Sequence, residues 1–76
     1  MKESLKKAAA DKLRLIRLER RDKIETLALK CGVSTSTICR YENGVSNMNI
    51  EILEKILKTY GITLDIFFEE IVAKMQ

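Results

Sequence analysis

The apolar residues of this chain recur three and four positions apart, which is the spacing of one face of an α-helix. Near the start, Ala9, Leu13 and Ile16 follow this spacing among Lys, Arg and Glu residues that favour helix. No stretch alternates apolar and polar residues for long enough to predict a strand, and proline is absent. The pattern therefore predicts an all-α fold. The five expected helices cover residues 4–20, 24–31, 35–43, 50–60 and 64–75.

Residues that cap helices stand at the expected boundaries. Ser34, Asn49 and Thr63 each precede an apolar-periodic segment and can accept hydrogen bonds from its first free N–H groups. Asp22, followed three residues later by Glu25, predicts a capping box at the start of the second helix. The ends of the second, third and fourth helices are marked by the glycines of the chain, Gly32, Gly44 and Gly61.

Composition narrows the class of protein. The chain has 76 residues, 46% hydrophobic and 33% charged, which indicates one globular domain over residues 1–76. The charged N-terminus lacks the apolar core of a signal peptide, and no apolar run approaches the roughly 18 residues of a membrane span. We therefore expect a cytoplasmic protein with no membrane partner.

The same composition argues against catalysis and metal binding. Histidine is absent, and two cysteines, Cys31 and Cys39, cannot complete a zinc site or build a disulfide scaffold. Cys31 falls on an apolar helix face, where we expect a small buried side chain. No nucleophile and base are paired, and no glycine-rich phosphate loop is present. The sequence predicts no enzymatic activity, no metal and no cofactor.

The net charge of +3 is unevenly distributed. Residues 1–23 carry nine basic and four acidic side chains, residues 24–48 balance, and residues 49–76 carry two more acidic than basic ones. A basic first third favours a polyanionic partner. It is equally typical of a solvated helix face, so charge alone does not choose between the two.

The second and third predicted helices form a helix-turn-helix over residues 23–43. Ala28 is small where the two helices must approach closely, and Val33 and Ile38 fill the angle between them. The outward face of the third helix carries threonine, serine and arginine, which can reach base edges in a major groove. A plain helical hairpin with a polar solvent face is the alternative that the spacing leaves open.

Four blocks of sequence occur together in a characteristic order. They are Leu13-Arg14-Leu15-Ile16-Arg17, then Leu27-Ala28-Leu29-Lys30-Cys31-Gly32-Val33-Ser34, then Ser36-Thr37-Ile38-Cys39-Arg40-Tyr41-Glu42-Asn43-Gly44, and finally Asn49-Ile50-Glu51-Ile52-Leu53 with Tyr60-Gly61-Ile62-Thr63-Leu64-Asp65. Together they resemble the Cro/CI-type (Xre family) helix-turn-helix regulators over about residues 9–68. The resemblance implies a compact five-helix, lambda-repressor-like DNA-binding domain in which the helix at 34–43 reads the major groove.

The resemblance also implies roles for single residues. The positions that would face base edges are Thr35, Ser36, Cys39 and Arg40. The positions in or after the third helix that would contact phosphates are Thr37, Asn43, Ser46 and Asn47. Arg17 and Glu42 would form a structural ion pair that ties the first helix to the third. This role removes Arg17 from the DNA-contacting set despite its charge.

The chain departs from the family pattern before the second helix. The family usually has a glycine and an apolar residue where Arg21 and Asp22 stand, and Thr/Ser-Gln where Lys23 and Ile24 stand. Ile24 cannot make the hydrogen bond of the glutamine to a phosphate, so we expect it in the core. Arg21 or Lys23 can supply that contact as a point charge. How the second helix is anchored to DNA stays open.

The last two helices, over about residues 50–75, are apolar on more than one face, and a small protein must bury such a surface. A fully wrapped five-helix core is one way. We favour a homodimer, since a two-fold dimer reads a palindromic operator whose half-sites lie about one helical turn, roughly 34 Å, apart. The proposed interface residues are Ile66, Phe68, Ile71, Val72 and Met75.

These observations favour a homodimeric transcription regulator, usually a repressor, that binds a palindromic operator in double-stranded DNA. The chain also resembles the small controllers of restriction–modification systems in its length, in Asn47-x-Asn49-Ile50 and in the pair Phe67-Phe68. The alternative is a protein-interaction module, such as an antitoxin whose last helix binds a toxin. No small-molecule pocket is evident in the sequence, so we expect no small-molecule effector.

Overall fold

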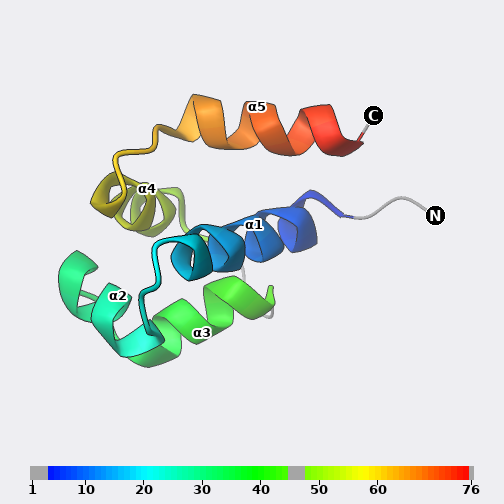
Figure 1. Ribbon diagram of the computed structural model, residues 1–76. Helices are drawn as coiled ribbons and strands as arrows, with labels where there is room; N and C mark the ends of the chain where they lie inside the picture. Colours follow the sequence, from blue (N-terminus) through cyan, green and yellow to red (C-terminus); the bar gives the residue numbers. More distant parts are fainter. Residues whose placement is uncertain (1–3, 45–47, 76) are drawn as a thin grey trace.

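A computed structural model describes residues 4–44 and 48–75, with Met75 described by its backbone alone. These residues form five helices and no strand, which confirms the all-α prediction (Figure 1). The helices are α1 (Leu5–Glu19), α2 (Ile24–Cys31), α3 (Thr35–Asn43), α4 (Ile50–Thr59) and α5 (Leu64–Met75). Within the described ranges, no helix is both long enough and apolar enough to cross a membrane.

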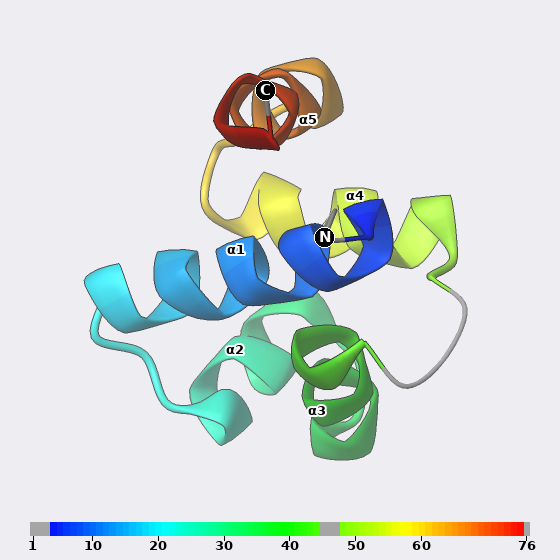
Figure 2. The ribbon, with the colours of Figure 1, turned by 90° about the vertical axis from the view of Figure 1, so that its right-hand side faces the viewer.

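Helix α1 runs through the middle of the molecule (Figure 1, Figure 2). Helices α2 and α3 lie together on one side of it in both views, and α5 lies on the opposite side. Helix α4 lies behind α1 in Figure 2 and contacts α2. This arrangement separates the helix-turn-helix from α5 by the thickness of the core.

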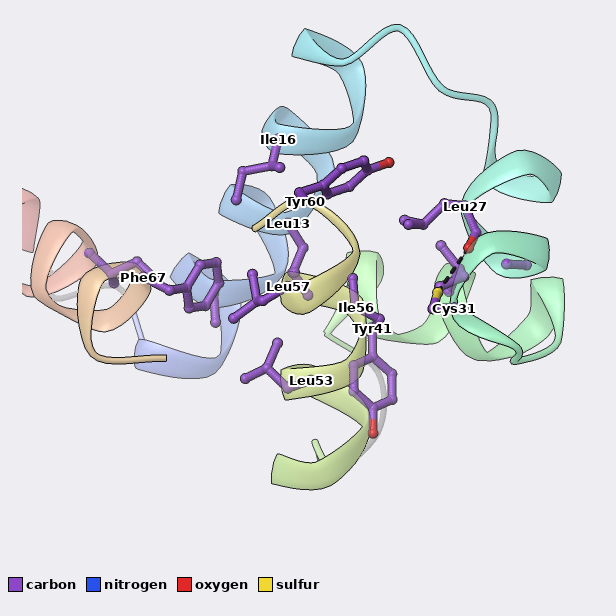
Figure 3. Close-up of a cluster of buried hydrophobic side chains, with 14 residues drawn as sticks. Leu13, Ile16, Leu27, Cys31, Tyr41, Leu53, Ile56, Leu57, Tyr60 and Phe67 are labelled. Carbon is purple, nitrogen blue, oxygen red and sulfur yellow. Dashed lines mark hydrogen bonds between the residues drawn. The ribbon is translucent and has the colours of Figure 1, made fainter. Parts of the chain in front are cut away.

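One hydrophobic core joins all five helices. The predicted α1 stripe of Ala9, Leu13 and Ile16 is buried, and α5 contributes Phe67, which points toward Leu57 of α4 (Figure 3). Phe67 and Leu57 are each 0% exposed. Burying a side chain of this size stabilises a fold by roughly 1.5–3 kcal/mol. The core therefore fixes α2 and α3 on a rigid base.

Cys31 belongs to this core, as expected. Its thiol donates a hydrogen bond to the Leu27 carbonyl oxygen at 2.8 Å, which the dashed line in Figure 3 marks. Burial raises the pKa of Cys31 above its ordinary value. Because only a thiolate is a good nucleophile or metal ligand, this cysteine acts as a packing residue.

Side-chain caps start two helices at the predicted residues. The Ser34 hydroxyl oxygen accepts a hydrogen bond from the Thr37 N–H at 3.1 Å at the start of α3. The Asn49 side-chain oxygen accepts from the Glu51 N–H at 2.8 Å at the start of α4. The backbone carbonyl of Thr63 accepts from the Phe67 N–H, while side-chain capping of α5 by Thr63 stays a prediction.

The predicted capping box of Asp22 and Glu25 is wrong. The N-cap position of α2 is Lys23, and no side chain caps this end. The Asp22 carboxylate instead accepts hydrogen bonds from the Tyr60 hydroxyl and the Lys30 ammonium group. A charged donor and a largely buried hydroxyl compete for the carboxylate more strongly than an exposed backbone N–H does.

Candidate nucleic-acid interface

The turn between α2 and α3 has the geometry that the sequence predicts for a helix-turn-helix. Gly32 adopts the left-handed conformation with φ of 70°, a region that favours glycine. The Val33 N–H then donates to the Ala28 carbonyl oxygen at 3.0 Å, which closes the turn. Ala28 is 3% exposed, so its small side chain lies at the close approach of the helices. Ile24 is half-buried against the core, as expected.

Helix α3 separates an apolar face from a polar one. Ile38 and Tyr41 are buried, at 1% and 6% exposed. On the other face, Thr35, Ser36 and Arg40 are exposed, while Cys39 is half-buried. Among the described residues, none forms an ion pair with Arg40. The structure thus leaves Thr35, Ser36 and Arg40 open to solvent on α3, with Cys39 less exposed than these three.

Two of the predicted phosphate-contacting side chains have partners within α3. The Thr37 hydroxyl lies 2.9 Å from the Ser34 hydroxyl, so the two share a hydrogen bond at the start of the helix. The Asn43 side-chain amide donates to the Cys39 carbonyl oxygen at 2.7 Å. Thr37 is half-buried and Asn43 is exposed. The other two predictions in this region, Ser46 and Asn47, lie outside the described residues.

The predicted ion pair between Arg17 and Glu42 is present. Arg17 Nε donates to Glu42 Oε2 at 2.7 Å, and its Nη2 donates to Oε1 at 3.0 Å, which is a bidentate geometry. Both residues are 8% exposed. The hydrogen bond with Glu42 raises the pKa of Arg17. The pair ties α1 to α3 through the core, and the Arg17 guanidinium is not available to DNA.

The segment between α1 and α2 carries the two remaining predicted phosphate contacts. Arg21 and Lys23 are both exposed. Arg21 has φ of 59°, a left-handed conformation that few residues other than glycine adopt. It stands where the family usually has glycine, so the backbone path is kept without the glycine. Lys23 adds a positive charge at the uncapped start of α2, where free N–H groups favour anions.

A side-chain network beside this segment was not predicted from the sequence. The Tyr60 hydroxyl donates to Asp22 Oδ2 at 2.7 Å, and Lys30 Nζ donates to the same oxygen at 3.0 Å. These hydrogen bonds lower the pKa of Asp22, and burial raises the pKa of Tyr60. The one signal in the sequence was Tyr60 on an inward helix face, because a buried tyrosine hydroxyl needs a partner.

The surface of α5 leaves only some of the residues of the predicted dimer interface exposed. Ile66 and Val72 are 50% and 43% exposed. Phe68 is half-buried and packs edge-on against Phe67, with ring centroids 5.2 Å apart. Assigning Ile71 to the interface was wrong, because it is 3% exposed and lies in the core of its own protomer. The side chain of Met75 lies outside the described part of the chain.

The family described as "Helix-turn-helix" matches residues 13–67. The chain belongs to this family. The match runs from the middle of α1 into the first turn of α5 and confirms the Xre-type resemblance. Members of this class are DNA-binding regulators rather than enzymes. No curated protein sequence matches the chain.

Solved structures show the same fold. The clp gene regulator ClgR from Corynebacterium glutamicum has a TM-score of 0.85 at 21% identity, with 100% of this chain and 97% of that chain covered. Restriction–modification controller protein C.Esp1396I, bound to a 25 base pair operator site, has a TM-score of 0.81 at 28% identity, covering 95% of each chain.

A second structure of the same controller is a tetramer in complex with its natural 35 base-pair operator. Its TM-score is 0.83 at 30% identity, with 96% of this chain and 97% of that chain covered. The similarity to the controller protein includes the helix-turn-helix and extends over nearly the whole of both chains.

Proposed function

We propose that this protein is a sequence-specific transcription regulator that binds double-stranded DNA through α3. The observation that carries the proposal is the exposed face of Thr35, Ser36 and Arg40, held on a helix-turn-helix whose other side is buried. The controller protein that shares this fold is bound to operator DNA. The proposal places the whole chain, residues 1–76, in one DNA-binding domain that works in the cytoplasm.

Arg40 is the proposed main reader of sequence. It is the single basic residue of α3 and lies exposed in the last turn of the helix. An arginine there can donate two hydrogen bonds to O6 and N7 of guanine. Thr35 and Ser36 at the start of α3 contact neighbouring base edges, and the half-buried Cys39 supplies an apolar contact.

Phosphate contacts position this reading surface in the groove. We assign them to residues just before α2, to residues of α3 and to the loop that follows α3. The proposed set is Arg21, Lys23, Thr37, Asn43, Ser46 and Asn47. Lys23 has the clearest support, because its charge lies at the uncapped start of α2. Arg21 lies two residues away and is equally exposed.

DNA binding is tested by titrating a fluorescently labelled duplex of mixed sequence at several salt concentrations. The logarithm of the binding constant should fall linearly with the logarithm of the salt concentration, since lysine and arginine displace counterions from the DNA phosphates. Lys23→Ala should reduce the slope by about one unit. Lys58→Ala is the matched control, because Lys58 is an exposed lysine on α4, outside the proposed interface. Binding that ignores salt, or equal slopes for both variants, would contradict the proposed contacts.

We further propose that the protein binds a palindromic operator as a homodimer through α5. The exposed apolar residues Ile66 and Val72 support this interface, and the similar controller protein forms a tetramer on its operator. Val72→Asp should yield monomers in sedimentation velocity runs, because an unpaired charge is costly to bury. Leu29→Asp is the control, since Leu29 is 84% exposed on α2. A dimer that survives Val72→Asp and Ile66→Asp would refute the interface.

A further inference from the structure

We infer that Asp22 is a positioning residue for DNA binding, one that holds the segment carrying Arg21 and Lys23 at a fixed place relative to α3. The inference rests on the proposed function. It answers how α2 is anchored in a chain that lacks the usual family residues there. Asp22 itself touches no DNA in this account. It acts through the backbone of its two neighbours.

Three helices converge on Asp22. From the end of α4, the Tyr60 hydroxyl donates to Oδ2 at 2.7 Å. From α2, Lys30 Nζ donates to Oδ1 and Oδ2 at 3.3 and 3.0 Å. From α1, Arg17 Nη1 donates to the Asp22 carbonyl oxygen at 2.9 Å, and the Arg17 carbonyl oxygen accepts the Asp22 N–H at 3.2 Å. The carboxylate and both backbone polar groups are therefore held.

Tyr60 is itself fixed on a second side. Arg20 Nη2 donates to the Tyr60 carbonyl oxygen at 3.2 Å, and the Arg20 guanidinium carbon lies 5.1 Å from the centre of the Tyr60 ring. Tyr60 as a whole is 8% exposed and belongs to the hydrophobic cluster drawn in Figure 3. The hydroxyl that reaches Asp22 is thus carried by a rigid side chain rather than by a mobile one.

The same network reaches the reading helix through Arg17. One guanidinium donates to the Asp22 carbonyl oxygen and, bidentately, to the Glu42 carboxylate of α3. The segment before α2 and the helix that reads bases are therefore attached to one buried cation. A change in the position of Asp22 alters the spacing between the phosphate anchor and the reading surface.

The local backbone depends on this support. Arg21 has φ of 59°, and a non-glycine residue keeps such a conformation only where its surroundings over-determine it. At the next boundary, no side chain caps the first turn of α2, and the local hydrogen bond at Lys23 is the one that its carbonyl oxygen accepts from the Leu27 N–H at 3.0 Å. The contacts of Asp22 add to such local bonds and hold the segment between α1 and α2 before DNA arrives. Pre-organisation of this kind raises affinity by lowering the ordering cost of binding.

A double-mutant cycle on DNA affinity tests the inference. Parent, Lys23→Ala, Tyr60→Phe and the double variant are titrated with one labelled mixed-sequence duplex at about 0.1 M salt. One lost phosphate contact weakens binding about eightfold at this salt, from a slope of about 0.9 per contact. In the parent, Lys23→Ala should weaken DNA binding by about this factor. In the Tyr60→Phe protein, the same substitution should weaken DNA binding by less than about twofold. Melting curves check that each variant is folded.

Two further variants separate positioning from general destabilisation. Tyr41→Phe removes another tyrosine hydroxyl, one that accepts a hydrogen bond from the Asn49 N–H at 2.8 Å. In this background, Lys23→Ala should weaken DNA binding as much as it does in the parent. Asp22→Asn changes the carboxylate directly and should reduce the Lys23 effect even if Tyr60→Phe does not fold. If Lys23→Ala weakens DNA binding by the same factor in the parent, in Tyr60→Phe and in Asp22→Asn, the inference about Asp22 is overturned while the proposed function stands. A parent that binds no duplex DNA would overturn the proposed function and this inference with it.

Discussion

Replacing Arg17 by methionine should destabilise the protein more than removing any surface charge. The substitution keeps most of the side-chain volume but leaves Glu42, whose side chain is 6% exposed, as a buried carboxylate without its cation. It removes two hydrogen bonds to Glu42 and one to the Asp22 carbonyl oxygen. Hydrogen bonds to charged groups contribute about 1.5–3 kcal/mol each, and breaking a buried pair costs about 3–5 kcal/mol.

That cost is large for a chain of 76 residues. Domains of this size have a free energy of unfolding of about 4–11 kcal/mol, at roughly 0.05–0.15 kcal/mol per residue. Since 1 kcal/mol shifts the midpoint of a small domain by about 4–8 °C, Arg17→Met should lower Tm by at least about 12 °C. Urea unfolding followed by circular dichroism measures the free energy, and a thermal melt measures Tm.

Two comparisons decide whether the burial argument is correct. Arg17→Met combined with Glu42→Met should cost less than the sum of the single variants, because no unpaired charge remains buried. Lys7→Ala breaks the pair with Asp11, whose side chains are 66% and 53% exposed, and should leave Tm nearly unchanged. The reasoning is refuted if Arg17→Met lowers the free energy of unfolding by less than about 1 kcal/mol. It is also refuted if the double variant loses as much free energy as the two single variants together.

Three further predictions concern the reading helix and its support. Arg40→Ala should cost about 1–3 kcal/mol of binding free energy and relax base preference at one position of the half-site, as measured by binding selection; unchanged preference would remove Arg40 from the reading set. Ser34→Ala should cost about 1 kcal/mol of unfolding free energy in urea, since it removes the cap of α3; an unchanged midpoint would contradict the cap. The pKa of Asp22 is lowered by its hydrogen bonds with Tyr60 and Lys30, so its stabilisation is present above about pH 4 and lost as the pH falls through the folded pKa. Asp22→Asn should therefore flatten the acid side of the stability curve, and an unchanged acid side would count against this role.

Local sequence signals predicted the elements of the fold because their causes are local. The stripe of Ala9, Leu13 and Ile16 is buried as its spacing requires, and Ser34 and Asn49 cap the helices that follow them. Each depends on residues within a few positions along the chain. The paired charges of Arg17 and Glu42, 25 positions apart, came from the family resemblance and not from the spacing.

The errors arose where tertiary contacts override a local preference. Asp22 has the spacing of a capping box, yet its carboxylate binds a tyrosine 38 positions away. Ile71 and Val72 are neighbours on a helix that is apolar on more than one face, and the apolar pattern alone does not decide that Ile71 is buried in the core while Val72 is exposed. Sequence patterns identify which faces are apolar, whereas the packing of the other helices decides which of those faces stays open.

The proposed function requires α3 to read base sequence in duplex DNA as part of a two-fold dimer. Selection of bound molecules from a pool of random duplexes tests the reading and the symmetry together. We expect enrichment of an inverted repeat whose half-sites are about one helical turn, roughly 34 Å, apart. When Arg40→Ala is selected in parallel, we expect the base preference to change at one position of each half-site. Recovery of unenriched random sequence, or of the same motif with Arg40→Ala, would contradict the proposed function.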